Sequence, residues 1–352
     1  MKVMSVVGAR PQFVKLAPID RALREAHAEH EILHTGQHYD PLLSKTFFDD
    51  LGISEPAYHL NVGSGHHGEQ TGAMLIDIEK ILLEDRPDWL LVYGDTNSTL
   101  AAAVAAVKLQ IPLAHLEAGL RSFNRAMPEE HNRVLTDHAA DLLLAPSQEA
   151  MDQLTREGLA QRSVLVGDVM ADVLFAQRDA VAQDPIPVPS SEGEYVIATI
   201  HRPQNTDDSV RLTAILEAFE RFPKPVFLLA HPRLQNVMKN HGGLVDRGNL
   251  HWHDPLPYPQ LVRAVMSASA VVTDSGGLQK EAFLLRTPCV TVRTETEWVE
   301  TVQLGWNQLV EPGEPMIRVI QAEPPKPTHA TPYGDGHAAH AVASVLSERL
   351  LS

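Results

Sequence analysis

Two carboxylates stand at, or one residue beyond, the ends of short apolar runs of the sequence. Asp95 follows the run 89–93, and Glu117 follows the run 112–116. Carboxylates at the ends of successive strands can share one crevice, shift each other's pKa and divide the roles of general acid and general base. A structural alternative for Asp95 is that it caps a helix beginning near Ser98. Glutamate is a poor helix cap, so Glu117 is harder to explain by structure alone.

The most distinctive local motif is TDSGGLQKE at residues 273–281. It places a turn of small residues between an expected strand and an expected helix. Ser275, Gly276 and Gly277 can present free backbone N–H groups to a phosphate without obstruction by side chains. Glu281, one turn later, can accept hydrogen bonds from ribose hydroxyls. Glycines are also common at helix starts that bind no ligand, so both interpretations stay open.

Three basic side chains lie near other strand ends. Arg10 stands at the amino end of an expected helix, where the helix dipole favours an anion. His201 directly follows the run 195–200, where an imidazole suits anion binding or proton transfer near neutral pH. Lys15 lies in an apolar stretch and is equally explained as a lysine whose stem covers apolar surface.

The segment Met127-Pro128-Glu129-Glu130 is typical of a helix start, because proline and acidic residues favour the first turn. From the residues alone, Glu129 is therefore a structural residue. Arg133, four positions later, is its expected ion-pair partner on the helix surface.

Apolar, β-branched runs alternate with helical patterns in two blocks along the chain. The expected strands are 2–7, 31–35, 89–93, 112–116, 142–145 and 163–166, then 195–200, 225–230, 249–252, 270–273 and 288–292. This alternation predicts βαβ units and parallel sheets. A segment rich in proline and serine, 183–193, separates the blocks. We expect an α/β fold of two Rossmann-like domains whose parallel sheets face a central cleft, with residues 1–182 and 193–335 as the domains and 336–352 as a final helix.

Composition excludes several classes of protein. The 352 residues carry a net charge of −16, which disfavours nucleic-acid binding. The longest uncharged apolar run, 100–107, is far below the about 20 residues that span a bilayer. The single cysteine, Cys289, excludes an internal disulfide and a cysteine-based metal cluster. The turn after the first strand is not a G-x-G-x-x-G motif, and the histidine pairs lack metal-ligand spacing. We expect a cytoplasmic protein without a metal.

The strings GARPQFVK, YGDTNSTLAAAVAA, HLEAGLRS, MPEEHNRVLTDH, HRPQNTDD, DSGGLQKEA, RTETEWVETV and PYGDG occur in this order. Together they resemble the non-hydrolysing UDP-N-acetylglucosamine 2-epimerase family, from residue 1 to beyond Gly336. The resemblance implies a GT-B-like fold, a C-terminal helix that returns to the first domain, and a homodimer. It also implies epimerisation of a UDP-sugar by anti-elimination and re-addition of UDP, through a 2-acetamidoglucal and without NAD or metal.

The resemblance also implies roles for individual residues. The acid/base carboxylates would be Asp95, Glu117 and Glu129, and the groups that hold the diphosphate would be Arg10, Lys15 and His201. Ser275, Gly276 and Gly277 would form the phosphate cradle. Glu281 would contact the ribose, and Arg133 would be a further substrate contact. Which carboxylate removes the proton and which returns it stays open.

Departures from the family pattern bear on substrate and regulation. Glu69 and Pro203 stand where epimerases activated by UDP-N-acetylglucosamine have arginine, so we expect little or no such activation. GARPQF, QKEAF and TEWVE are closer to the branch acting on UDP-2,3-diacetamido uronic acids, and Lys280 or Arg293 would be the group to meet a uronate carboxylate. A GT-B glycosyltransferase is the alternative with the same fold, and a hydrolysing epimerase or a non-catalytic sensor are further alternatives.

Overall fold

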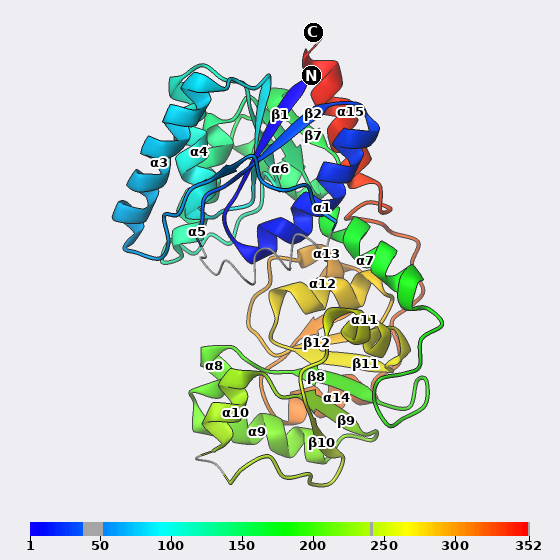
Figure 1. Cartoon of the computed structure of the whole chain (residues 1–352). Coiled ribbons are helices and arrows are strands. Elements are labelled where there is room, and N and C mark those ends of the chain that lie inside the picture. Colours follow the sequence, from blue (N-terminus) through cyan, green and yellow to red (C-terminus); the bar gives the residue numbers. More distant parts are fainter. Residues whose placement is uncertain (38–51, 240–241, 351–352) are drawn as a thin grey trace. The chain divides into compact units, whose positions relative to one another are not determined.

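The chain forms two compact α/β units in the computed structural model (Figure 1). The residues that the structure describes are 1–37, 52–239 and 242–350. Unit 1 comprises Met1–Val173 and Thr331–Ser352, and unit 2 comprises Leu174–Ala330. Every pair of named strands in both sheets is parallel, which confirms the predicted fold class of two Rossmann-like domains.

Unit 1 is built on a seven-stranded sheet in the order β3-β2-β1-β4-β5-β6-β7. Its strands are β1 (Lys2–Val7), β2 (Glu29–His34), β3 (Tyr58–His59), β4 (Trp89–Tyr93), β5 (Leu113–Leu116), β6 (Leu142–Ala145) and β7 (Ser163–Leu165). Its helices are α1 (Arg10–Glu25), α3 (His67–Glu84), α4 (Asn97–Lys108), α5 (Pro128–Ala139), α6 (Gln148–Arg156), the short 3-10 helix Ala160–Arg162, the start of α7 (Val169–Val181), and α15 (Ala338–Leu350).

Both faces of this sheet are covered, which explains why its strands read as continuous apolar runs. On β1, Val3 and Val7 face a core formed with α1 and α15, whereas Met4 and Val6 face a core formed with α3 and α4. Figure 1 shows the two helix layers on opposite sides of the sheet. The alternation follows from the two-residue period of a strand.

The C-terminal segment belongs to unit 1. Helix α15 packs against α1 in the same apolar core, and the Trp89 indole donates a hydrogen bond to the Leu346 carbonyl at 3.1 Å. The Asp172 carboxylate accepts hydrogen bonds from the backbone N–H groups of Ala338 and Ala339 at 3.0 and 2.8 Å. These contacts satisfy free N–H groups at the start of the last helix.

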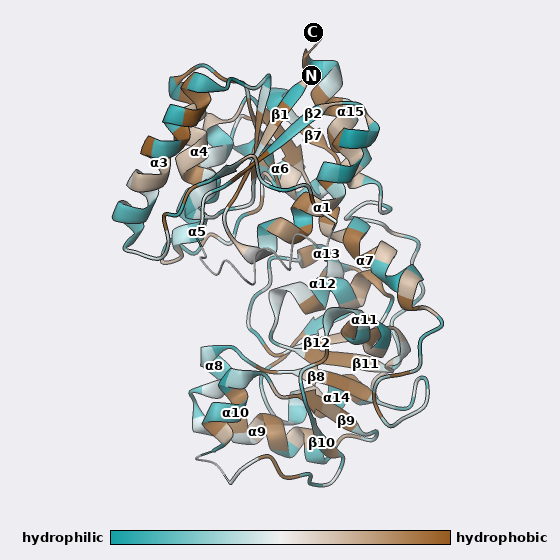
Figure 2. Ribbon diagram, in the orientation of Figure 1, coloured by the Kyte–Doolittle hydropathy of each residue, from teal (hydrophilic) through white to brown (hydrophobic). Residues whose placement is uncertain are grey.

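Unit 2 has a six-stranded sheet in the order β10-β9-β8-β11-β12-β13. Its strands are β8 (Val196–Thr199), β9 (Val226–Leu229), β10 (Leu250–His253), β11 (Ala270–Thr273), β12 (Cys289–Thr291) and β13 (Asn307–Leu309). Its helices are the rest of α7, then α8 (Pro203–Thr206), α9 (Ser209–Glu220), α10 (Pro232–Met238), α11 (Tyr258–Ser267), α12 (Gly276–Leu284), α13 (Val299–Gln303) and α14 (Glu314–Gln321). Helices α9 and α14 pack on one face and α11 and α12 on the other, so the strands between them are hydrophobic (Figure 2).

The segment 183–193, expected to be a linker, is packed onto unit 2. Val188 is buried in the core with Tyr195 and Ile197, and Arg263 donates to the Asp184 carbonyl at 2.6 Å. The division between the units falls instead within α7, before this segment. Ile186 and Val188 of the segment explain the difference, because these apolar side chains bury surface that a free linker would leave in water.

Each sheet has one place where the strand order reverses, between β1 and β4 in unit 1 and between β8 and β11 in unit 2. In open parallel sheets, ligands bind outside the carboxyl ends of the strands at such a reversal. The candidate residues Asp95 and Glu117 follow β4 and β5, and His201 follows β8. Within the described part of the chain, no helix is both long and apolar enough to span a bilayer.

Candidate active site

In unit 1, Lys15 from α1 and Glu117 from the end of β5 form an ion pair between Nζ and Oε2. Only 16% of the Lys15 side chain and 10% of the Glu117 side chain are exposed. Burial alone would lower the pKa of the Lys15 ammonium, but the Glu117 carboxylate outweighs this effect and raises the pKa above its ordinary value. Lys15 is therefore a charged group at the strand ends and not a lysine that merely covers apolar surface.

The turn after β4 fits closely beneath this pair. Gly94 has φ = +60°, and a Cβ there would lie 3.1 Å from Glu117 Oε2 and 3.7 Å from Lys15 Nζ. Glu117 itself has φ = +67°, a left-handed conformation that is rare for a residue with a side chain. Conformations of this kind persist where surrounding contacts hold them, and they occur often at functional sites.

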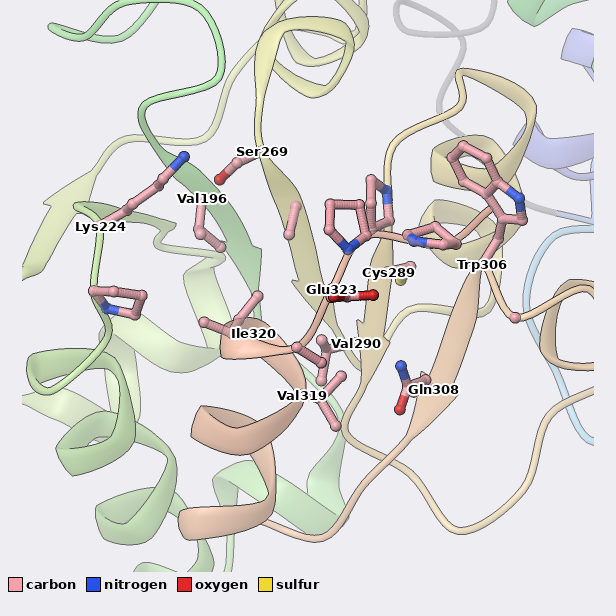
Figure 3. A pocket seen from close by; sticks show the side chains of 17 residues that line it. Val196, Lys224, Ser269, Cys289, Val290, Trp306, Gln308, Val319, Ile320 and Glu323 are labelled. Carbon is pink, nitrogen blue, oxygen red and sulfur yellow. The ribbon is translucent and has the colours of Figure 1, made fainter. Parts of the chain in front are cut away.

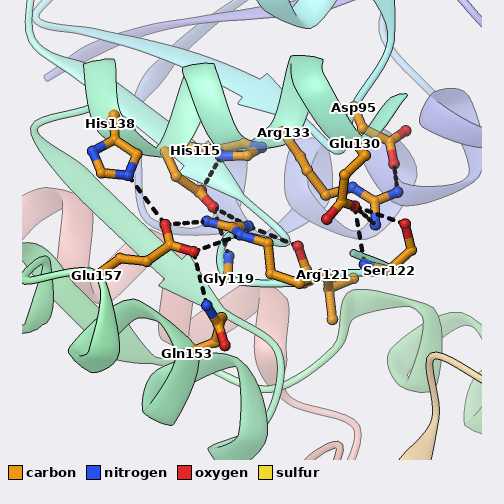
Figure 4. Close-up of polar contacts among 12 residues, drawn as sticks. Asp95, His115, Gly119, Arg121, Ser122, Glu130, Arg133, His138, Gln153 and Glu157 are labelled. Carbon is orange, nitrogen blue, oxygen red and sulfur yellow. Dashed lines mark hydrogen bonds and ion pairs between the residues drawn. The ribbon is translucent and has the colours of Figure 1, made fainter. Parts of the chain in front are cut away.

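Asp95, the next residue, forms an ion pair with Arg133 of α5 (Figure 4). Arg133 also lies 3.3 Å from Glu130, its neighbour on the same helix. Asn132 donates to the Asp95 backbone carbonyl at 3.0 Å. Helix α5 thus holds both the side chain and the backbone of Asp95, and the expected partner of Arg133, Glu129, is not the one observed.

The two glutamates at the start of α5 have different environments. Glu130 is buried and accepts three hydrogen bonds of 2.9 Å, from Ser122 N, Ser122 Oγ and Phe123 N. Although burial opposes it, these bonds lower the pKa of the Glu130 carboxyl. Glu129 is exposed on the first turn of the helix. Among the described residues, it takes no part in the contacts that join Lys15 to Glu117 or Asp95 to Arg133.

A buried glutamine that sequence patterns did not single out joins these strand ends. Gln12 Oε1 accepts from Gly8 N at 2.8 Å and Ala9 N at 3.1 Å, and its Nε2 donates to the Tyr93 carbonyl at 2.8 Å. It therefore ties the turn after β1 to the end of β4. The side chain of Arg10, predicted to bind diphosphate, lies outside the described residues.

In unit 2, Asp274 organises the turn that carries His201. This buried carboxylate accepts from the backbone N–H groups of His201 and Arg202, at 3.1 and 2.9 Å, and lies 3.2 Å from His201 Nδ1. Burial lowers the pKa of His201 below its ordinary value, and the neighbouring His231 and Arg202 lower it further against the opposing charge of Asp274. His201 and the segment 273–281 are thus brought together, as their positions after adjacent strands predict.

The amino end of α12 carries a carboxylate of the chain itself. A Cβ on Gly276 would lie 2.5 Å from Glu297 Oε1 and 3.8 Å from Arg202 Nη2. Glu297 Oε2 lies 3.1 Å from Arg293 Nη1. Burial and the nearby charge of Arg293 lower the pKa of Arg202. Two guanidinium groups and a helix N-terminus therefore surround one anionic group, as a phosphate site would require.

The tryptophan after Glu297 holds this loop in place. The Trp298 indole donates to the Gly276 carbonyl at 2.8 Å, and the Lys280 ammonium lies 4.1 Å from the centre of its ring. Lys280 is 4% exposed. Glu281 accepts from the Tyr258 hydroxyl at 3.2 Å, and burial, assisted by Glu281, raises the pKa of Tyr258.

A separate cavity of about 180 Å³ lies at the opposite end of the unit 2 sheet (Figure 3). Its lining includes Val196, Ala270 and Cys289, the first residues of β8, β11 and β12. Burial raises the pKa of the Cys289 thiol to about 12, which agrees with a packed residue and not a nucleophile. The described residues contain no group of three or more His, Cys, Asp or Glu side chains arranged to hold a metal ion.

Comparisons with known proteins show which family this chain resembles. A family model described as UDP-N-acetylglucosamine 2-epimerase matches residues 21–347. The chain is 44% identical over 355 residues to a UDP-N-acetylglucosamine 2-epimerase homolog of Methanococcus maripaludis, covering 98% of this chain and 99% of that protein. It is also 44% identical over 366 residues to the UDP-2,3-diacetamido-2,3-dideoxy-D-glucuronate 2-epimerase of Pseudomonas aeruginosa, covering 99% and 100%. The crystal structure of Methanocaldococcus jannaschii UDP-GlcNAc 2-epimerase in complex with UDP-GlcNAc and UDP matches with a TM-score of 0.82 and 38% identity, over 99% of this chain and 100% of that one.

Proposed function

The chain belongs to the UDP-N-acetylglucosamine 2-epimerase family, a family of isomerases with a GT-B-like fold, and we propose that it inverts C2 of a UDP-linked 2-acetamido sugar. The observation that carries this proposal is the set of charged groups at the strand ends of each unit. Unit 1 presents Asp95 and Glu117, each paired with a cation. Unit 2 presents a helix N-terminus with two arginines.

The proposed reaction has two steps. A carboxylate removes the C2 proton, the C–H electron pair forms a C1–C2 double bond, and the C1–O bond breaks so that UDP leaves with its electron pair. UDP then re-adds at C1 of the 2-acetamidoglucal while a carboxylic acid returns a proton to the opposite face of C2. The C2 hydrogen is weakly acidic because no carbonyl adjoins that carbon. Stabilisation of the departing diphosphate must therefore supply part of the driving force.

The proposal gives each group a task. Asp95, Glu117 and Glu129 are the carboxylates that exchange protons with the sugar. Lys15, Arg10, Arg133 and His201 bind the substrate and offset its charge, and Glu281 accepts from the ribose. Gly276 and Gly277 donate backbone N–H groups to the diphosphate. The Ser275 N–H, expected to do the same, already donates to Thr273 Oγ1 at 2.9 Å, and its hydroxyl caps α12. The Lys15–Glu117 pair supports this division, because it sets a carboxylate beside a cation that can bind the departing diphosphate.

Two substrates fit the family, a neutral UDP-N-acetyl sugar and a UDP-2,3-diacetamido uronic acid. We propose UDP-N-acetylglucosamine and UDP-N-acetylmannosamine as the interconverted pair, which the family model and the M. jannaschii complex support. The P. aeruginosa relative supports the uronate as the second candidate. Incubating the purified protein with each sugar separately, followed by chromatography of the 2-epimers, tests this choice. Turnover of the uronate alone would reverse it.

The same assay separates the remaining alternatives. A hydrolysing epimerase would release free N-acetylmannosamine and UDP, and a glycosyltransferase would form product only with an acceptor. Because Glu69 and Pro203 replace the expected arginines, the initial rate should rise hyperbolically with UDP-N-acetylglucosamine; a sigmoidal rise would show activation. We further propose a homodimer acting in the cytoplasm, and sedimentation analysis at micromolar concentration tests the dimer.

A further inference from the structure

A fully buried histidine lies beneath the turn that carries Asp95. His115 is on β5, and its side chain is 0% exposed. Its Nε2 lies 2.7 Å from the Gly94 carbonyl oxygen, and its Nδ1 lies 2.7 Å from Asp137 Oδ1 on α5. A carbonyl and an ionised carboxylate accept hydrogen bonds but do not donate them. Each ring nitrogen therefore has to supply its own proton.

The ionised state of Asp137 follows from its other contacts. Its Oδ2 lies 2.7 Å from Arg121 Nη1 and accepts from Gly119 N at 3.0 Å. Although burial opposes them, the contacts with His115 and Arg121 lower the pKa of the Asp137 carboxyl, and the Arg121 guanidinium is cationic whatever the state of His115. Arg121 in turn pairs with Glu157 at 2.8 Å (Figure 4). With a cationic His115, each anion of the series His115, Asp137, Arg121 and Glu157 has a cationic neighbour. Glu157, at its outer end, is 21% exposed and also lies 3.1 Å from His138.

Residues of β5 therefore hold Gly94 at both of its backbone polar groups, the N–H and the carbonyl. Gly94 N donates to the Leu116 carbonyl at 3.0 Å, and the Gly94 carbonyl accepts from His115. That carbonyl belongs to the peptide plane leading into Asp95. We infer that His115, held as an imidazolium by Asp137, is a positioning residue that fixes the Gly94–Asp95 turn against Glu117.

A second buried histidine of unit 1 provides the matched comparison. His30 has a side chain that is 1% exposed, and its Nδ1 lies 2.7 Å from Asp20 Oδ1. Its Nε2, however, lies 2.8 Å from the Ser5 hydroxyl, which can donate as well as accept. A neutral ring therefore satisfies the contacts of His30 but not those of His115. Replacing either histidine disturbs the core of the same sheet, but only His115 acts on the Asp95 turn.

Two substitutions distinguish the roles of the two ring nitrogens of His115. In H115Q, the amide nitrogen takes the position of Nε2 and can still donate to Gly94. In H115N, the amide nitrogen takes the position of Nδ1, keeps the bond to Asp137 and releases the Gly94 carbonyl. H30Q is the control for loss of core stability.

This inference rests on the proposed function, and its expected kinetic result is specific. Because a displacement of about 1 Å can cost about 100-fold in rate, kcat should fall about 100-fold in H115N and much less in H115Q. The KM for the UDP-sugar and the Kd for UDP should stay unchanged in both. H30Q should lower the unfolding temperature without lowering kcat. Equal kcat losses in H115N, H115Q and H30Q, or a wild-type kcat in H115N, would overturn the inference.

The protonation of His115 is measured without turnover. In a protein labelled with 15N at histidine, long-range 1H–15N correlations should show one buried imidazolium at pH 8 that H115N removes, whereas free imidazole is neutral there. A neutral tautomer at His115 would contradict the inference. If the protein epimerised no UDP-sugar, the proposed function would fail, and this spectrum would still decide whether His115 is held as a cation.

Discussion

The Glu297 carboxylate lies over Gly276, at the helix start whose backbone N–H groups the proposal assigns to a phosphate. Glu297→Gln removes its charge while keeping its volume. The carboxylate lies 3.1 Å from Arg293 Nη1, with 31% of its own side chain exposed. A part-exposed ion pair contributes about 0.2–1 kcal/mol, and a carboxylate at a helix N-terminus contributes about 0.3–1 kcal/mol. When a diphosphate displaces Glu297, the protein loses both contributions. Together they amount to about 1.4 kcal/mol, which corresponds to about tenfold in affinity for the diphosphate.

We therefore expect E297Q to bind UDP about tenfold more tightly than the wild type in isothermal titration calorimetry. The matched control is E295Q, since Glu295 is an exposed carboxylate of the same loop and also acts on Arg202. E295Q makes the same change in net charge without uncovering Gly276, so its effect should stay within about twofold, as expected of an exposed charge. Weaker binding by E297Q, or equal gains in both variants, would refute the reasoning.

Three further predictions concern unit 1. E117Q removes the anion paired with Lys15, so turnover should fall about 10²- to 10⁴-fold with UDP binding unchanged in calorimetry; a wild-type rate excludes Glu117 from proton transfer. G94A forces a side chain onto φ = +60° and places its Cβ 3.1 Å from Glu117 Oε2. It should destabilise the protein by about 1–2 kcal/mol in thermal unfolding and lower turnover, and a fully stable, active variant contradicts this. Hydrogen bonds from Arg121 lower the pKa of Glu157 to about 2. Because its pKa is lower in the folded than in the unfolded protein, its stabilisation is complete above about pH 4.3 and disappears toward pH 2. Acid titrations of E157Q should lack this part of the stability loss, and an unchanged titration would show that the Arg121 contact does not stabilise.

Much of the fold was predictable because both sheets are buried on two faces. The strands Lys2–Val7, Trp89–Tyr93 and Ala270–Thr273 have the bounds that their apolar runs predict. The two-residue strand Tyr58–His59 and the four-residue helix Pro203–Thr206 were not predicted. Elements this short show no hydrophobic periodicity in the sequence, and contacts with neighbouring elements stabilise them.

The candidate site was predictable where a side chain capable of acid, base or anion-binding chemistry closely follows the end of an expected strand. Asp95, Glu117 and His201 lie there, and their sequence neighbours already indicated it. Gln12 and Glu297 were missed because their importance depends on residues far away in the sequence, such as the Tyr93 carbonyl and Gly276. A glutamine on a helix and a glutamate in a loop are ordinary until the contacts are known.

The same reasoning explains the residues whose interpretation changed. Lys15 fits an apolar helix face until Glu117 is found beside it. Arg133 was expected to pair with Glu129 by helix spacing, but it contacts Glu130 and Asp95 instead. The tertiary contact with Asp95 and the contact with the buried Glu130 replace an exposed pair with Glu129, which would contribute only about 0.3–0.5 kcal/mol.

The central claim is that this chain inverts C2 of the UDP-sugar without an added cofactor, through carboxyl groups whose protons exchange with water. Proton NMR of the purified protein with UDP-N-acetylglucosamine in D2O, without metal or NAD, tests it most directly. The account predicts UDP-N-acetylmannosamine carrying deuterium at C2, together with loss of the C2 proton signal from the remaining substrate. Epimer that retains its C2 proton, or a spectrum unchanged with both the neutral sugar and the diacetamido uronate, would contradict the claim.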